Sequence, residues 1–80
     1  MTQKRYDADT PSHYVITVRG RVGQEWSAWF GGMAIMCALR EGVPHSTLNG
    51  VLADQSALHG VLARIRDMNL VLVAVVRVSL

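Results

Sequence analysis

Cysteine, aromatic residues and long apolar runs are scarce in this 80-residue chain. The single cysteine, Cys37, cannot form an internal disulfide, which excludes a disulfide-stapled secreted scaffold. The longest apolar run, residues 70–76, has seven residues, far short of the roughly 17 to 20 needed to span a bilayer. Residues 1–12 are polar and have no apolar signal-peptide core. We therefore expect a cytoplasmic protein that is not inserted in a membrane.

Charge is also sparse. Eight Lys and Arg residues against six Asp and Glu residues leave a formal charge of +2, and the longest basic run is Lys4-Arg5. This charge is too small to indicate nucleic-acid binding. His13 and His45 have no second ligand at metal spacing. We expect no metal, no cofactor and no nucleic-acid partner.

Apolar residues, by contrast, make up half of the chain, and only 18% of residues are charged, which is typical of a packed domain. We expect one domain over residues 13–80, preceded by a flexible tail over residues 1–12. A domain of this size buries only roughly 60% of its unfolded surface, so a dense core or a partner subunit must supply stability.

Alternating apolar residues predict a first strand over residues 14–22. Trp26, Trp29 and Phe30 have the i, i+3, i+4 spacing of one helical face, so we expect a short helix that ends at the two glycines after Phe30. Two further strands, residues 33–39 and 46–52, would form a hairpin.

A second helix is predicted from Asp54, whose carboxylate can cap the first turn, to Asn69, which tolerates a left-handed conformation. A fourth strand follows over residues 70–78. The order of elements predicts an α+β, ferredoxin-like βαββαβ fold, with a four-stranded antiparallel sheet and two helices on one face. The first and third strands would be central, and the second and fourth would be the edges.

Gln55, His59 and Arg66 fall on one flank of the predicted second helix. They could form a binding site in which Arg66, beside His59, donates to a carboxylate or phosphate. The alternative is a solvated shoulder of the helix. Trp26 and Trp29 likewise either line a ligand or partner surface or hold the first helix against the sheet.

Three functions of ferredoxin-like proteins can be compared with these residues. RNA binding needs aromatic residues on the central strands, and the third strand has none. A metal carrier needs a Cys-x-x-Cys loop, which one cysteine cannot supply. Residues 18–24 resemble the first strand and phosphate loop of acylphosphatases, with Asn49 near the end of a hairpin, but residues 26–30 lack that family's arginine.

A resemblance covers most of the chain after the tail. Residues 14–20, 26–30 and 50–67 are together similar to a group of short, uncharacterised prokaryotic proteins. Their shared signature is Trp-x-x-Trp-Phe followed by Gly-x-x-x-Asp-Gln-x-x-Leu-His-Gly-x-Leu-x-x-Ile-Arg-Asp. The chain departs from that group in the apolar residues 33–39 and in residues 43–45. The resemblance implies no activity. A broader similarity, at the level of the fold, is to ACT-type regulatory domains, whose ligand loop is loosely matched by Gly20 and Gly23.

The fourth predicted strand is apolar on both faces, although helices can cover only one. Val71, Val73 and Val75, with Met36 on the second strand, are therefore the expected oligomer interface. We predict a homo-oligomer, most simply a two-fold dimer, that is not an enzyme and binds a protein partner or small ligand in a regulatory or scaffolding role. A small acylphosphatase-like hydrolase is the alternative.

Overall fold

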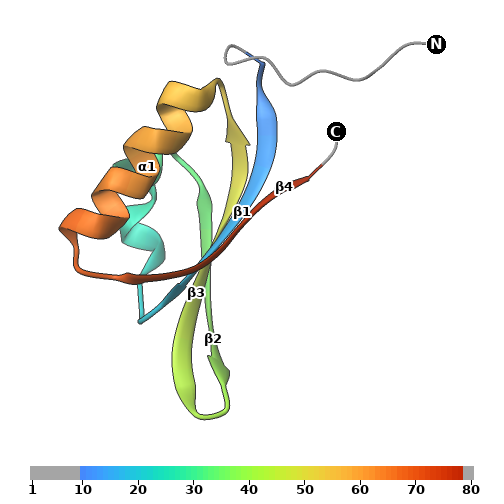
Figure 1. Cartoon of the computed structure of the whole chain (residues 1–80). Helices are drawn as coiled ribbons and strands as arrows, with labels where there is room; N and C mark the ends of the chain where they lie inside the picture. The colour runs from blue at the N-terminus through green and yellow to red at the C-terminus, as the bar shows by residue number, and fades with distance from the viewer. Residues whose placement is uncertain (1–9, 79–80) are drawn as a thin grey trace.

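The computed structural model describes residues 10–78, which form a curved four-stranded sheet with its helices on one side (Figure 1). In chain order the elements are β1 (Ser12–Arg19), the 3-10 helix η1 (Gln24–Phe30), β2 (Ala34–Arg40), β3 (Val43–Leu52), α1 (Gln55–Asp67) and β4 (Val71–Val78). The strand order across the sheet is β2-β3-β1-β4, and each neighbouring pair is antiparallel. Most of the predicted tail, residues 1–9, lies outside the described residues.

The prediction of a ferredoxin-like βαββαβ fold is wrong, because the first helical connection is not an α-helix. η1 is a seven-residue 3-10 helix, so α1 is the one α-helix in residues 10–78. Its N-cap residue, Gly23, provides no side-chain hydrogen bond, and Gly31 ends it in a left-handed conformation with φ of 69°. A segment of seven residues with a glycine at each end can form only a few α-helical hydrogen bonds. These are too few to favour an α-helix over the narrower 3-10 helix. The broader prediction of an α+β chain with an antiparallel sheet holds.

The 3-10 geometry also changes which side chains of η1 are buried. With three residues per turn, Trp26 and Trp29 lie one above the other, and Phe30 lies a third of a turn away. Phe30 is fully buried, whereas Trp26 is 45% exposed and Trp29 is 42% exposed. The three side chains therefore do not share one helical face, as an α-helix would have placed them.

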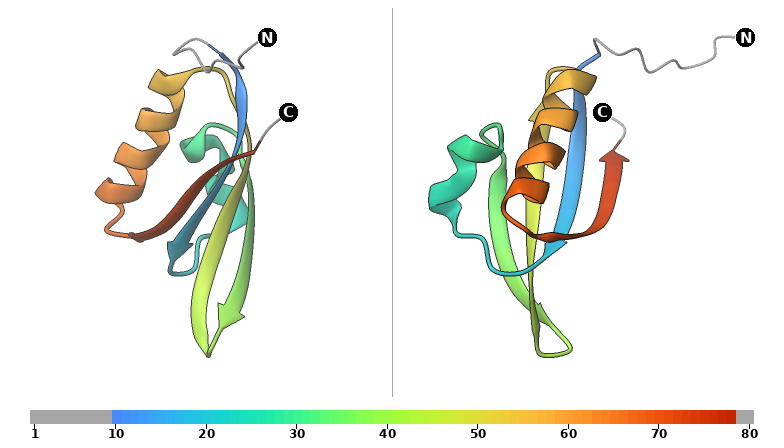
Figure 2. Two further views of the ribbon diagram at one scale, coloured as in Figure 1. Left: turned by 45° about the vertical axis from the view of Figure 1, so that its right-hand side comes forward. Right: turned by 60° about the vertical axis from the view of Figure 1, so that its left-hand side comes forward.

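The core lies between the sheet and the two helices. Ile16 and Val18 of β1, Leu48 of β3 and Phe30 of η1 are fully buried there, and Ile65 of α1 is almost so. Figure 2 shows both helices packed over the same face of the sheet. The other face of the sheet carries no helix, and we call it the open face.

Both ends of α1 agree with the sequence. The Asp54 carboxylate accepts a hydrogen bond from the Ala57 backbone N–H at 2.8 Å, which confirms the predicted N-cap. Asn69 has φ of 61°, which confirms the predicted left-handed residue after the helix. Leu58, Val61 and Ile65 are buried along the inner face of α1.

The β2–β3 hairpin is longer than the sequence suggested. Only Glu41 and Gly42 form its turn, and both have positive φ, 52° and 78°. Two such residues close a hairpin whose strands twist in the usual sense, so residues 43–45 belong to β3 and not to a loop. The hairpin extends beyond the region that the helices cover (Figure 1). For this reason Cys37, on β2, is exposed.

Candidate functional site

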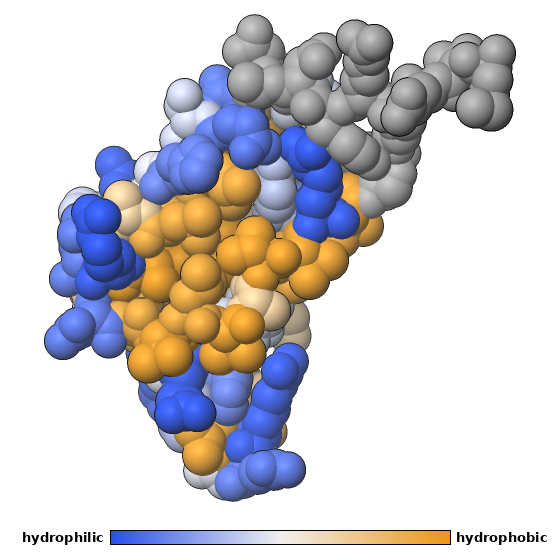
Figure 3. All heavy atoms as spheres, in the orientation of Figure 1, coloured by the Kyte–Doolittle hydropathy of each residue, from blue (hydrophilic) through white to orange (hydrophobic). Residues whose placement is uncertain are grey.

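The most unusual surface of the described chain is β4, an edge strand with little cover. Its large apolar side chains are between 38% and 54% exposed: Val71, Leu72, Val73, Val75, Val76 and Val78. We call these six residues the β4 surface. Figure 3 shows hydrophobic side chains gathered over β4 and in the region between β4 and α1. Exposed apolar surfaces of this kind are uncommon on monomeric proteins and frequent where proteins associate.

A β-bulge at Val73 changes how the β4 surface is divided between the two faces. Val76 pairs with Val15, and Val75 pairs with Ile16, but the register then shifts so that Leu72 pairs with Val18. Val75 and Leu72 therefore both lie on the helix side of the sheet, as do their buried partners on β1. Without the bulge, two residues three positions apart would lie on opposite faces. Strict alternation along β4, assumed from the sequence, is wrong because the bulge adds one residue.

Val71, by the same register, pairs with Arg19 and lies on the open face, opposite to Val75. The residues of the predicted interface thus lie on both sides of one strand. An edge-to-edge contact would bury both sides together, whereas a contact through the open face alone would leave Val75 in water.

Met36 lies apart from the β4 surface. It is 77% exposed on β2, at the other edge of the sheet. Thr47 and Thr17 lie between Met36 and Ala74 of β4 in the same row of the open face. Three strand spacings, about 14 Å, separate the two edges. A single partner strand that contacts the β4 surface would therefore not reach Met36.

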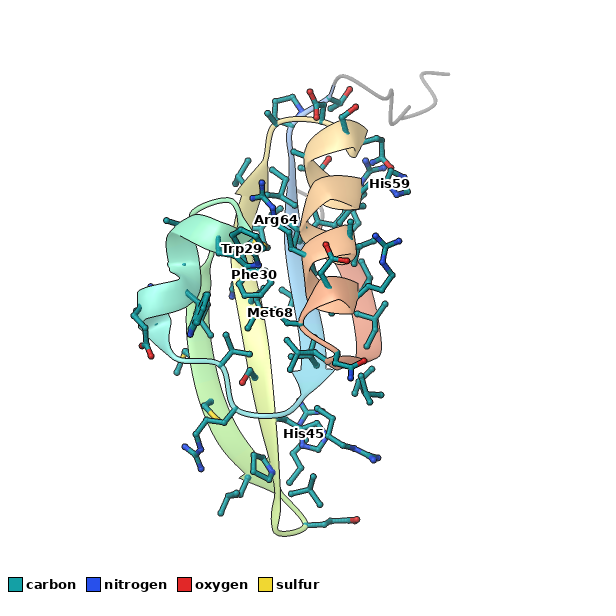
Figure 4. All side chains as sticks on the ribbon, turned by 90° about the vertical axis from the view of Figure 1, so that its left-hand side faces the viewer. Trp29, Phe30, His45, His59, Arg64 and Met68 are labelled. Atoms are coloured by element: carbon teal, nitrogen blue, oxygen red, sulfur yellow. The ribbon has the colours of Figure 1, made fainter. Side chains whose placement is uncertain are left out.

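The predicted binding site on α1, made of Gln55, His59 and Arg66, is not assembled around a common point. The Gln55 amide donates to the Tyr14 hydroxyl at 2.7 Å, and Arg66 pairs with the exposed Asp67 at 3.4 Å. Gln55 and Arg66 are eleven residues apart, which is about 16 Å along the helix. His59 is exposed on the side of α1 away from η1 (Figure 4).

Arg64, which the sequence did not single out, joins α1 to η1. Its Nη1 donates to the Trp29 carbonyl oxygen at 2.8 Å, and its guanidinium carbon lies 4.8 Å from the centroid of the Trp29 ring. Figure 4 shows the two side chains facing each other between the helices. A contact between residues 35 positions apart leaves no signal in local periodicity. Trp29 is thus partly exposed to solvent and in contact with the Arg64 guanidinium.

The loop after β1 does not have the geometry of a phosphate loop. The Gly20 N–H donates to the Pro44 carbonyl at 2.9 Å, and the Val22 N–H donates to the Ser46 hydroxyl at 2.8 Å. These amides are therefore already used within the fold. Asn49 pairs with Val15, four residues before the end of β1, or about 13 Å from the loop.

Asn49 instead contacts a histidine. Its Oδ1 is in hydrogen-bond contact with His13 Nε2 on the open face. His45, the other histidine of the sheet, contacts the Val43 carbonyl through Nδ1 at 2.9 Å. His13 lies in β1 and His45 lies in β3.

Residues 10–78 contain no group of three or more His, Cys, Asp and Glu side chains that could hold a metal ion. In the same residues, no helix is long and apolar enough to cross a membrane.

The fold and its surfaces define a small α+β domain built on one antiparallel sheet. A family model described as a domain of unknown function, DUF8691, matches residues 13–76, and the chain belongs to that family. The match begins within β1 and ends within β4, so it includes every element described above. No curated protein and no solved structure matches the chain.

Proposed function

We propose that this protein works by self-association through β4, as a non-enzymatic, cytoplasmic protein that binds a protein partner or small ligand in a regulatory or scaffolding role. The observation that carries the proposal is the β4 surface, an apolar strand at the sheet edge with both faces exposed. The absence of free amides at Gly20 and Val22 argues against the acylphosphatase-like alternative.

Antiparallel pairing of β4 with β4 of a second copy fits this surface best. A two-fold axis through the edge would join two four-stranded sheets into one of eight strands. Such pairing gives partners to the backbone groups of the edge and covers side chains on both faces of β4. Burying the remaining exposed part of each valine or leucine is worth about 1 kcal/mol. Twelve such side chains in a dimer would offset an association cost of several kcal/mol.

The family resemblance supports a binding role more than a reaction. The signature shared with short prokaryotic proteins includes Trp29, which contacts Arg64, and Asp54, which caps α1. Both have structural explanations that need no substrate.

Sedimentation equilibrium at micromolar concentration tests the proposal. We expect a species of twice the 8.8 kDa chain mass. Val73→Lys places a charge at the bulge of β4 and should shift the protein to the monomer. Met36→Lys, at the opposite sheet edge, is the matched control and should leave the dimer intact. A wild-type monomer, or a dimer broken by Met36→Lys and not by Val73→Lys, would contradict pairing through β4.

A further inference from the structure

A shallow groove of about 440 Å³ lies where α1, the end of η1 and the end of β3 meet. Its floor and walls are formed by Gly31, Val51, Leu52, Ala53, Ala57, Gly60, Val61 and Arg64. The volume falls within the range of small-molecule sites. None of the lining residues belongs to β4.

Arg64 is the only charged residue that lines the groove in the described part of the chain. The hydrogen bond to the Trp29 carbonyl and the contact with the Trp29 ring hold its guanidinium in one position. A guanidinium has five N–H donors in a rigid fork, and this bond uses one of them. An anion would therefore meet a cation that is already oriented, and less side-chain entropy would be lost on binding.

The rest of the lining is apolar and small. Gly60 faces open space, since a Cβ built there would meet no atom within 4 Å. Ala57 and Ala53 continue the groove toward the start of α1, where the Asp54 carboxylate caps the helix. The groove thus has a cationic end at Arg64 and an apolar end close to a negative charge. A ligand with one anionic head and an apolar body would therefore bind in one orientation, with its head at Arg64.

We propose that this groove binds a monocarboxylate with a short apolar chain, with the carboxylate on Arg64 and the chain along Gly60 and Ala57. Seven residues separate Arg64 from Ala57, which is roughly 10 Å along α1 and matches an extended chain of about eight carbons. A dianionic phosphate fits less well, because the groove supplies one cation in an apolar setting. The proposal names the class of small ligand in the proposed function. It can fail without β4 pairing failing, because the two surfaces share no residue.

Titration with octanoate tests this assignment on the full chain. In a Trp26→Phe background, which leaves one tryptophan, Trp29 fluorescence reports the Arg64 end of the groove. Amide chemical shifts of Gly60 and Ala57 report the other end. We expect saturable changes with octanoate and none with octylamine, which has the same chain and the opposite charge. Equal binding of the two compounds, or no saturation with octanoate, would overturn the proposal.

Two pairs of variants separate the charge from the apolar channel. Arg64→Gln should weaken octanoate binding by roughly tenfold or more, whereas Arg66→Gln, on the same helix, should leave it unchanged. Gly60→Leu should fill the groove and abolish binding, whereas Gly60→Ala should retain it. Circular dichroism checks that each variant is folded, and sedimentation reports β4 pairing independently. Wild-type affinity in both Arg64→Gln and Gly60→Leu would place the ligand elsewhere and refute the assignment.

Discussion

Ser46→Ala should destabilise the protein far more than a serine-to-alanine change usually does. Ser46 is fully buried in β3, and its hydroxyl accepts from the Val22 N–H at 2.8 Å and donates to the Gly20 carbonyl at 2.7 Å. One hydroxyl therefore ties the loop after β1 to the neighbouring strand. Alanine would remove the bridge and leave two backbone groups without this partner.

The magnitude follows from the burial of the two groups. Val22 is buried, so its N–H would lose its partner where water has little access, at a cost of about 1–3 kcal/mol. Gly20 is half-buried, so its carbonyl can be partly rehydrated and costs less. We expect a total of about 2–4 kcal/mol, which is a large part of the roughly 4–12 kcal/mol typical of a chain this long. The melting temperature should fall by on the order of 10–20 °C.

Urea denaturation followed by circular dichroism measures this loss. The midpoint should fall while the slope of the transition stays the same, because the same surface is exposed on unfolding. Ser56→Ala, at an exposed position in the first turn of α1, is the control and should change stability by less than about 0.5 kcal/mol. A loss below about 0.5 kcal/mol for Ser46→Ala would show that the bridge contributes nothing net and would refute the reasoning.

Two further predictions concern α1. Asp54→Ala should lower the free energy of unfolding by about 1 kcal/mol in thermal or urea denaturation, because the Ala57 N–H loses its cap. Asp54→Asn should restore most of that loss. If both variants were as stable as wild type, the cap would be contradicted. Ile65→Ala should lower the free energy of unfolding by about 2–5 kcal/mol and Leu62→Ala by distinctly less, since Ile65 is buried and Leu62 is only partly buried. The reverse order in the same assay would mean that α1 is rotated from the orientation described.

Features of the fold that depend on neighbours in the sequence were predictable. The N-cap at Asp54, the left-handed Asn69 and the buried side of β1 each follow from a few adjacent residues. These signals are local because capping, backbone conformation and strand alternation are decided within a turn or a few residues. The α+β class followed from the order of such segments.

Features that depend on distant residues were not predictable. The bulge at Val73 is a property of the register with β1, and an apolar run of valines carries no mark of where the register shifts. The exposure of Cys37 depends on how far the helices extend over the sheet. The 3-10 helix places Phe30 a third of a turn from Trp26, whereas an α-helix would place these two residues on one face, and their spacing in the sequence suits either helix.

The candidate site shows the same division. The apolar character of β4 was visible in the sequence, but the placement of Val71 and Val75 on opposite faces was not. Arg64 was missed because its partner, Trp29, is distant in the sequence and close only in the fold.

The pairing of β1 with β4 has a consequence for synthesis on the ribosome. β1 pairs with β3 along one edge and with β4 along the other. β4 follows all the other strands of residues 10–78 in the sequence, so the second pairing forms only after β4 has been made. At roughly 5–20 residues per second, the interval between the emergence of Arg19 and that of Val71 is about 3 to 10 seconds. During this time a finished β2–β3 hairpin and α1 can already dock on β1, while its other edge stays open. Translation speed over α1 and β4 thus sets how long the nascent chain displays an unpaired strand to chaperones and to other copies.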